Sequence, residues 1–233
     1  MRVLLRLSDR TIVITGGASG IGAATAEKCR SEGARVIVLD RAEADVSDEP
    51  SVRAFFDAIG GPIHALVNSA GIAVRKTVLE QDVESWDRVM AVNVKGSYLC
   101  SKHALPKMMA LGGAIVHLSS VVGVTGVRNR SAYSTSKGAI VALTRNMALD
   151  FAQYKIRVNC VCPGFTRTPL TAGLLSDPER EAKLTALHPL GRLGEASDIA
   201  NAIAFLVSED ASWITGQAIA VDGGFTAGHA VDV

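Results

Sequence analysis

The sequence predicts an α/β fold in which one parallel sheet is covered by helices on both faces. Short apolar runs alternate along the chain with amphipathic stretches of helical periodicity. The runs are almost continuously apolar, as strands buried on both faces of a sheet are. A glycine-rich turn follows the first run and opens the first helix, which is how a doubly wound, Rossmann-like sheet begins.

The expected strands are runs of β-branched and other apolar residues that end at a polar residue or a glycine. The second run, Arg-Val-Ile-Val-Leu, ends at Asp40, and the third ends at Asn68. The last follows Gly216 and ends before Asp222. In chain order the strands are expected at 11–14, 35–39, 64–68, 114–118, 156–162 and 217–221.

The expected helices are identified by apolar spacing and by residues that start or stop helices. Asp48 and Pro50 open one helix and Gly60 ends it, with apolar residues at i, i+3, i+4 and i+7 in between. The other helices are expected at 21–31, 86–109, 131–151 and 198–207.

Composition excludes several other classes of protein. Hydrophobic residues make up 48% of the 233 residues and charged residues 20%, which excludes a disordered chain. The net charge of +1 and the aromatic content of 5% argue against a nucleic-acid-binding surface. No repeat, charge block or linker interrupts the chain. We therefore expect one dinucleotide-binding and catalytic domain over residues 1–233.

Cysteine usage and hydropathy indicate a cytoplasmic protein. The four cysteines form no Cys-x-x-Cys pair and are interpreted as buried thiols of a reducing compartment. Residues 1–10 are too short and too basic for a signal peptide. The longest uncharged stretch, 108–127, contains several glycines and serines, so it is interpreted as helix end, strand and loop rather than a membrane span. The histidines lack metal-ligand spacing, and no metal site is expected.

The turn from Thr15 to Gly22 has the residues of a phosphate-binding loop. Gly16 permits the sharp exit from the strand, Gly20 lets backbone approach a pyrophosphate, and Gly22 lets the helix pack closely. The start of the helix then offers free N–H groups and partial positive charge to an anion. The spacing is G-x-x-x-G-x-G rather than G-x-G-x-x-G.

Several motifs in a fixed order resemble those of the short-chain dehydrogenase/reductase family. Besides the glycine turn they are Asn68-Ser69-Ala70-Gly71, Asn93, Ser120, Tyr133-x-x-x-Lys137, Pro163-Gly164 and Val221-Asp222-Gly223-Gly224. The resemblance covers almost the whole chain. Each motif alone is weak, whereas the set is highly specific.

The resemblance implies that Tyr133 is the general acid/base of an alcohol–ketone interconversion. Tyr133 and Lys137 share one helix face at i, i+4, and an adjacent ammonium is expected to lower the tyrosine pKa. Ser120 follows a strand at its carboxyl end, where a hydroxyl can bond a substrate oxygen. Ser119 is the competing serine. Asn93 is implied to hold a water that links Lys137 to solvent.

The resemblance also implies a nicotinamide cofactor, and Asp40 favours NAD over NADP. A carboxylate at the end of the second strand can bond both ribose hydroxyls and repels a 2′-phosphate, by ~4 kcal/mol at 4 Å and an effective dielectric of 20. Arg41, which could meet a phosphate, is the complication. The implied cofactor contacts are Gly16, Ser19, Gly20, Ile21, Gly22, Asp40, Asp45, Val46, Asn68, Ala70, Gly71, Tyr133, Lys137, Pro163, Gly164, Phe165, Thr166 and Thr168.

One departure from the family follows Asp40. Relatives usually place a helix and a third, edge strand before the next Asp-Val, whereas here only Arg41-Ala42-Glu43-Ala44 precedes Asp45. A parallel crossover needs about a dozen residues. We therefore expect the edge strand and its crossover helix to be missing or reduced, which leaves the position of Asp45 and Val46 open.

The function expected is NAD-dependent oxidation of a secondary alcohol or reduction of a ketone. The alternatives are an NADPH-dependent ketoreductase of the oxoacyl-carrier-protein reductase type and a non-catalytic NAD-binding scaffold. Residues 169–190 are expected to form a variable lid over a neutral, mainly apolar substrate. Arg128 and Arg130 could instead meet an anionic substrate, although a solvated loop is favoured. The resemblance implies a homotetramer or homodimer.

Overall fold

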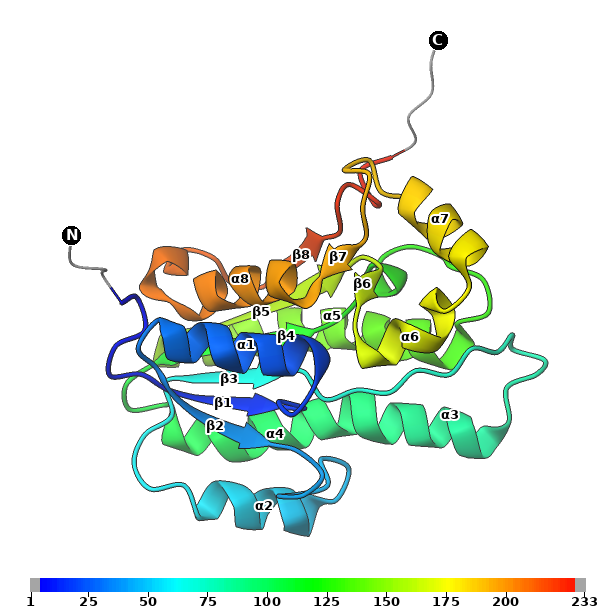
Figure 1. The fold of residues 1–233 in the computed structure, drawn as a ribbon. Coiled ribbons are helices and arrows are strands. Elements are labelled where there is room, and N and C mark those ends of the chain that lie inside the picture. The colour runs from blue at the N-terminus through cyan, green and yellow to red at the C-terminus, as the bar shows by residue number, and fades with distance from the viewer. Residues whose placement is uncertain (1–4, 229–233) are drawn as a thin grey trace.

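Six parallel strands form the central sheet of the structure, a computed structural model that describes residues 5–228 (Figure 1). Residues 1–4 and 229–233 of the expected domain, and part of the segment considered as a signal peptide, lie outside the described residues. The order of the strands is β2-β1-β3-β4-β5-β8. Their bounds are β1 (Thr11–Thr15), β2 (Arg35–Leu39), β3 (Ala65–Asn68), β4 (Gly113–Leu118), β5 (Ile156–Pro163) and β8 (Ala218–Val221).

Helices cover both faces of this sheet, which confirms the predicted fold class. Figure 1 shows α1 (Gly20–Ser31) and α8 (Ala196–Val207) on one side and α2 (Glu49–Asp57) and α4 (Gly96–Ala104) on the other. The long helix α5 (Ser131–Phe151) packs on the same face as α4. Because successive strand residues point to opposite faces, the strands β1 to β5 each contribute to two apolar cores, one on either face of the sheet.

The sheet ends at β2, as the short connection after Asp40 predicts. Residues 40–48 form turns, and the described chain has no strand between β2 and α2. Ala44 and Val46 of this connection are buried against the core that α2 and α4 share. The loop therefore packs on the core beside the β2 edge of the sheet.

The expected helix at 86–109 is interrupted around Asn93, one of the predicted catalytic residues. It is divided into α3 (Val83–Met90), one wide π turn (Ala91–Lys95) and α4, which is followed by a short 3₁₀ turn (Leu105–Lys107). A π turn inserts one extra residue and changes which side chains face inward. Asn93, in the middle of this turn, is buried.

The region after β5 contains the expected lid segment and two short strands that the sequence pattern does not show. Two-residue strands β6 (Thr166–Arg167) and β7 (Gly194–Glu195) pair in parallel, and between them lie α6 (Pro169–Leu175) and α7 (Pro178–Ala186). Further 3₁₀ turns lie at Val121–Gly123, Ala152–Tyr154 and Glu209–Ala211. No helix in residues 5–228 has both the length and the apolar character needed to cross a membrane.

Substituting Gly22 tests the close packing of α1 on the glycine turn. A Cβ at Gly22 would lie 2.1 Å from the carbonyl oxygen of Gly16, so Gly22→Ala forces the turn to move and is expected to destabilise by about 1–3 kcal/mol. Gly173→Ala in α6 is the matched control, because nothing lies within 4 Å of its Cβ; it should be neutral or stabilising. Urea unfolding of both variants measures the difference, and equal effects would contradict this packing.

Candidate active site

A cavity of about 770 Å³ lies along the carboxyl ends of β1, β2, β3 and β4. This edge is where ligands bind in open parallel sheets, at the point where the strand order reverses. Cavities of this size hold small molecules and cofactors. The lining residues are Gly16, Ser19, Gly20, Ile21, Leu39, Asp40, Arg41, Ala44, Asp45, Val46, Ser47, Ser69, Ala70, Gly71, Ile72, Arg88, Ala91, Val92, Leu118, Thr168, Pro169 and Leu170.

The glycine turn forms one wall of this cavity and is bonded to the turn after β3. Gly16 has a φ of +65°, and a Cβ there would lie 2.7 Å from the Cα of Ala70. The Thr15 hydroxyl accepts hydrogen bonds from the backbone N–H groups of Ser69 and Ala70, each at 3.1 Å. A side chain at Gly16 would therefore separate the two turns.

Charged groups of both signs line the end of the cavity beside β2. The Asp40 carboxylate accepts backbone N–H bonds from Ala18 and from Arg41, both at 2.9 Å. The Asp45 carboxylate accepts bonds from the Ser47 hydroxyl and backbone N–H, which lower the Asp45 pKa. Arg41 and Arg88 line the same cavity, and their positive charges lower that pKa further.

Lys137 places a buried ammonium beside Tyr133. The Lys137 side chain belongs to a residue only 4% exposed, and Nζ donates a 2.7 Å hydrogen bond to the carbonyl of Leu118 at the end of β4. Nζ lies 5.6 Å from the centre of the Tyr133 ring. Burial favours the neutral amine and lowers the Lys137 pKa to about 8.

The pKa of Tyr133 moves in the direction opposite to the one expected from the sequence. Burial raises it, because the phenolate is poorly solvated; the Ser120 hydroxyl and the positive charge of Arg130 oppose part of the rise. The i, i+4 spacing correctly places the lysine beside the ring, but it contains no information on how deeply the ring is buried. Within the protein alone, desolvation is the larger effect.

The Asn93 amide joins three segments of the site. Its Oδ1 accepts from the backbone N–H of Ile72 at 2.9 Å, and its Nδ2 donates to the Ile72 carbonyl at 2.9 Å and to the Ser136 hydroxyl at 3.0 Å. A Cβ at Gly71 would lie 3.4 Å from Asn93 Oδ1 and 3.6 Å from Lys137 Nζ. The amide and the ammonium thus converge on Gly71.

Ser119 and Ser120 have different surroundings, which separates the two candidate serines. The Ser119 hydroxyl donates a 2.8 Å bond to the Lys137 carbonyl and so joins β4 to α5. Ser120 lines a second, smaller cavity of about 60 Å³ together with Tyr133. The other residues around it are Ala73, Arg75, Val121, Val122, Arg130, Gly164, Phe165, Leu170 and Thr171.

The predicted cofactor contacts divide into cavity-lining and supporting residues. The large cavity is lined by Gly16, Ser19, Gly20, Ile21, Asp40, Asp45, Val46, Ala70, Gly71 and Thr168, and the small one by Tyr133, Gly164 and Phe165. The remaining predicted contacts line neither cavity: Gly22, Asn68, Lys137, Pro163 and Thr166. Among these, Asn68 is bonded in the interior to the Ser101 hydroxyl and the His117 ring, at 3.0 and 3.1 Å.

Two arginines line the cavities but are absent from the residues expected from the sequence. Arg88 lines the large cavity and Arg75 the small one. No motif marks either position. The available signal was only a positive charge in the segment that follows the Asn68–Gly71 turn. An exposed arginine in such a segment cannot be distinguished, from one sequence, from an ordinary solvated side chain.

The large cavity has the features that a nicotinamide dinucleotide requires. Gly20 has no side chain, and a Cβ there would lie 3.4 Å from the Cβ of Thr168 across the cavity. The N-terminus of α1 has no side-chain cap, so its first N–H groups are available to a phosphate. Asp40 lies at the end of β2, where a ribose-binding acid is found in dinucleotide folds.

Comparison with known proteins shows the family to which the chain is similar. A family model described as enoyl-(acyl carrier protein) reductase matches residues 42–226, and one described as short chain dehydrogenase matches residues 10–47. The chain is 44% identical to cis-4-hydroxycyclohexanecarboxylate dehydrogenase of Sinomonas cyclohexanicum, over 94% of this chain and 98% of the relative. It is 41% identical to 2-(S)-hydroxypropyl-CoM dehydrogenase 3 of Xanthobacter autotrophicus, over 95% and 98%.

A solved structure gives the same result for the fold. Gluconate 5-dehydrogenase of Burkholderia cenocepacia, in complex with NADP and tartrate, superposes with a TM-score of 0.92 at 29% identity, over 97% of this chain and 98% of that one.

One conclusion follows from the glycine turn, the tyrosine–lysine pair and these similarities. The chain belongs to the short-chain dehydrogenase/reductase family, as an NAD(P)-dependent alcohol dehydrogenase or ketone reductase.

Proposed function

We propose that the protein interconverts a secondary alcohol and a ketone with NAD, with Tyr133 as general acid/base. The observation that carries this proposal is the position of Tyr133 and Ser120 in the small cavity, which adjoins the large one at Leu170. The large cavity would hold the dinucleotide and the small one the substrate.

Each polar group of the site then has a role in moving one proton. Held by the glycine turn and Asp40, NAD would supply the acceptor for the hydride that leaves the alcohol carbon. Ser120 donates a hydrogen bond to the substrate oxygen, and Tyr133 takes the hydroxyl proton or returns it to a ketone. The positive charge of the Lys137 ammonium offsets part of the free-energy cost of burying the Tyr133 phenolate. Asn93 holds Ile72 and α5 in place beside Gly71, where we propose a water that connects Lys137 to solvent.

We propose NAD rather than NADP because of the Asp40 carboxylate at the cavity edge. A 2′-phosphate in its neighbourhood would be repelled. Arg41 and Arg88 line the same cavity and favour the second candidate, an NADPH-dependent ketoreductase of the oxoacyl-carrier-protein reductase type. Cofactor preference discriminates between the two.

The substrate lid and the assembly are also proposals. Residues 169–190 include α6 and α7, and Leu170 of α6 lines both cavities, so a movement of α6 would open or close them together.

Tyr98 on α4 and Leu149 on α5 are exposed apolar side chains, Leu149 to 81%. We propose that these helices form the interface of a homodimer or homotetramer. We take 4-hydroxycyclohexanecarboxylate, named for a relative, as the first alcohol to assay.

Tyr133→Phe tests the acid/base assignment. Removal of the hydroxyl should lower kcat for alcohol oxidation by about 10²–10⁴-fold, since proton transfer is lost, while NAD still binds. Nicotinamide absorbance measures turnover and calorimetry measures NAD binding. Tyr154→Phe, at a tyrosine that lines neither cavity, is the control and should retain activity. Full turnover by Tyr133→Phe would exclude the role.

Asp40→Asn tests the choice of nucleotide. Asparagine keeps an oxygen for the Ala18 N–H but removes the negative charge, so the ratio of kcat/KM for NAD over NADP should fall about tenfold or more. Asp57→Asn, on the exposed surface of α2, should leave the ratio unchanged. A wild-type ratio below one would favour the ketoreductase candidate.

Lys137→Met tests the cost of the buried ammonium. The folded-state pKa of about 8 lies below the ordinary lysine pKa of 10.5, so the unfolded chain binds more protons between these values. Wild-type stability should therefore rise with pH across this window relative to the variant, by up to about 3 kcal/mol. Urea unfolding at pH 7 and at pH 10.5 measures the change. A pH-independent difference would contradict the shift.

A further inference from the structure

Two arginines extend the small cavity beyond the groups that the proposed reaction uses. Arg75 and Arg130 line it together with Ser120 and Tyr133. Arg130 is half-buried and Arg75 is exposed. Burial and the positive charge of Arg75 both lower the Arg130 pKa, so the two guanidinium groups lie close enough to repel each other.

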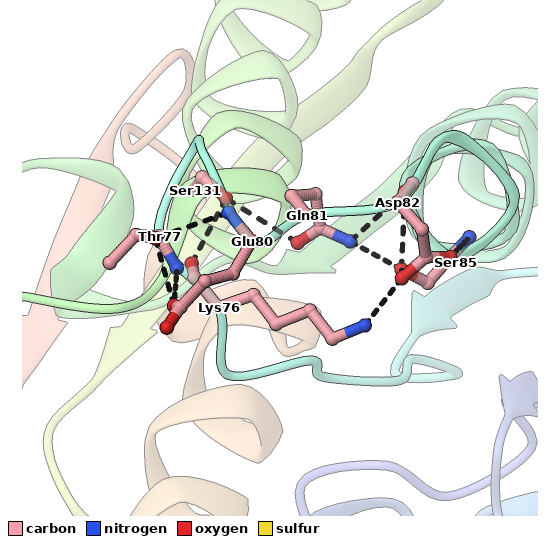
Figure 2. Close-up of polar contacts among 7 residues, drawn as sticks. All are labelled: Lys76, Thr77, Glu80, Gln81, Asp82, Ser85 and Ser131. Atoms are coloured by element: carbon pink, nitrogen blue, oxygen red, sulfur yellow. Dashed lines mark hydrogen bonds and ion pairs between the residues drawn. The ribbon is translucent and has the colours of Figure 1, made fainter.

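The backbone holds these two arginines next to each other. Figure 2 shows the segment before α3 tied to the start of α5: the Lys76 carbonyl accepts bonds from the backbone N–H and the hydroxyl of Ser131, at 3.3 and 3.1 Å. The Ser131 hydroxyl also lies 3.4 Å from the Gln81 Oε1. Because Arg75 precedes Lys76 and Arg130 precedes Ser131, the same bonds bring the arginines together.

The neighbouring charges in this segment are paired, whereas the arginines are not. Lys76 forms an ion pair with Asp82, and Glu80 accepts bonds from the hydroxyl and backbone N–H of Thr77 (Figure 2). Within residues 5–228, the side chains of Arg75 and Arg130 form no ion pair or hydrogen bond with a protein group. Two like charges held together without a counter-charge raise the free energy of the empty site, and an anion would relieve this cost.

We propose that Arg75 and Arg130 bind the carboxylate of a compact hydroxy acid whose hydroxyl lies at Ser120 and Tyr133. The planar guanidinium groups match the geometry of a carboxylate. This proposal rests on the proposed function and names its substrate class. It departs from the neutral, apolar substrate expected from the sequence, because Arg130 lies at the cavity rather than in a solvated loop.

The test compares 4-hydroxycyclohexanecarboxylate with its carboxamide, which keeps shape and hydroxyl but removes the charge. The wild-type enzyme should prefer the acid in kcat/KM by about tenfold or more. Arg75→Met and Arg130→Met should each reduce this preference about tenfold, through KM for the acid. Arg75→Lys and Arg130→Lys, which keep the charge, should retain part of it. Arg128→Met is the matched control, an exposed arginine outside both cavities, and should leave the preference unchanged.

The outcomes separate this proposal from the proposed function. Equal use of acid and carboxamide, or a preference that survives both methionine variants, would overturn the arginine site while leaving the alcohol dehydrogenase intact. Absence of turnover with any alcohol would refute the proposed function instead. In that case calorimetric titration of the NAD-loaded protein with cyclohexanecarboxylate still decides: binding that both methionine variants abolish supports the site, and no binding to wild type overturns it.

Discussion

The buried ammonium of Lys137 is the constraint on which most of this structure depends. Its bond to the Leu118 carbonyl requires β4 to end beside α5, and the Ser119 hydroxyl fixes that approach through the Lys137 carbonyl. Gly123 permits it as well, since a Cβ there would lie 2.7 Å from the Lys137 backbone. The protein thus uses packing energy from the sheet and helix to hold a charge where it is poorly solvated, as functional sites often do.

The second constraint is the π turn, which connects that ammonium to the rest of the site. The extra residue places the Asn93 amide inside, where it bonds both polar backbone groups of Ile72 and the Ser136 hydroxyl. The segment after β3, the helix after α3 and the helix that carries Tyr133 are therefore fixed relative to one another. We attribute part of the preorganisation of the small cavity to this network, because the segment after β3 and the helix α5 both line that cavity.

Most of the sheet could be predicted from the sequence because its strands are buried on both faces and so are continuously apolar. The run 35–39 coincides with β2, and the missing edge strand follows from the four residues after Asp40. The strands β6 and β7 could not be predicted, since two residues have no period. The π turn was also missed, because the apolar pattern continues through it.

The parts of the candidate site that belong to sequence motifs could be predicted. The parts that depend on burial, or on contacts between segments distant in sequence, could not. The glycine turn and Asp40 line the large cavity as expected, whereas the Asn68 side chain is used in the interior. The raised Tyr133 pKa depends on burial, which spacing does not reveal. Arg75 lines the small cavity in a segment that the bonds between Lys76 and Ser131 join to α5, and these segments are distant in sequence.

The pH dependence of kcat/KM in both directions tests the central claim, that one group, Tyr133, exchanges the proton with the substrate. Alcohol oxidation requires the phenolate and should rise with pH, whereas ketone reduction requires the phenol and should fall. Each profile should bend at the apparent pKa of Tyr133 in the cofactor complex from which that direction starts. Profiles that are flat, or that slope in the same direction, would contradict a single tyrosine acid/base at the centre of this site.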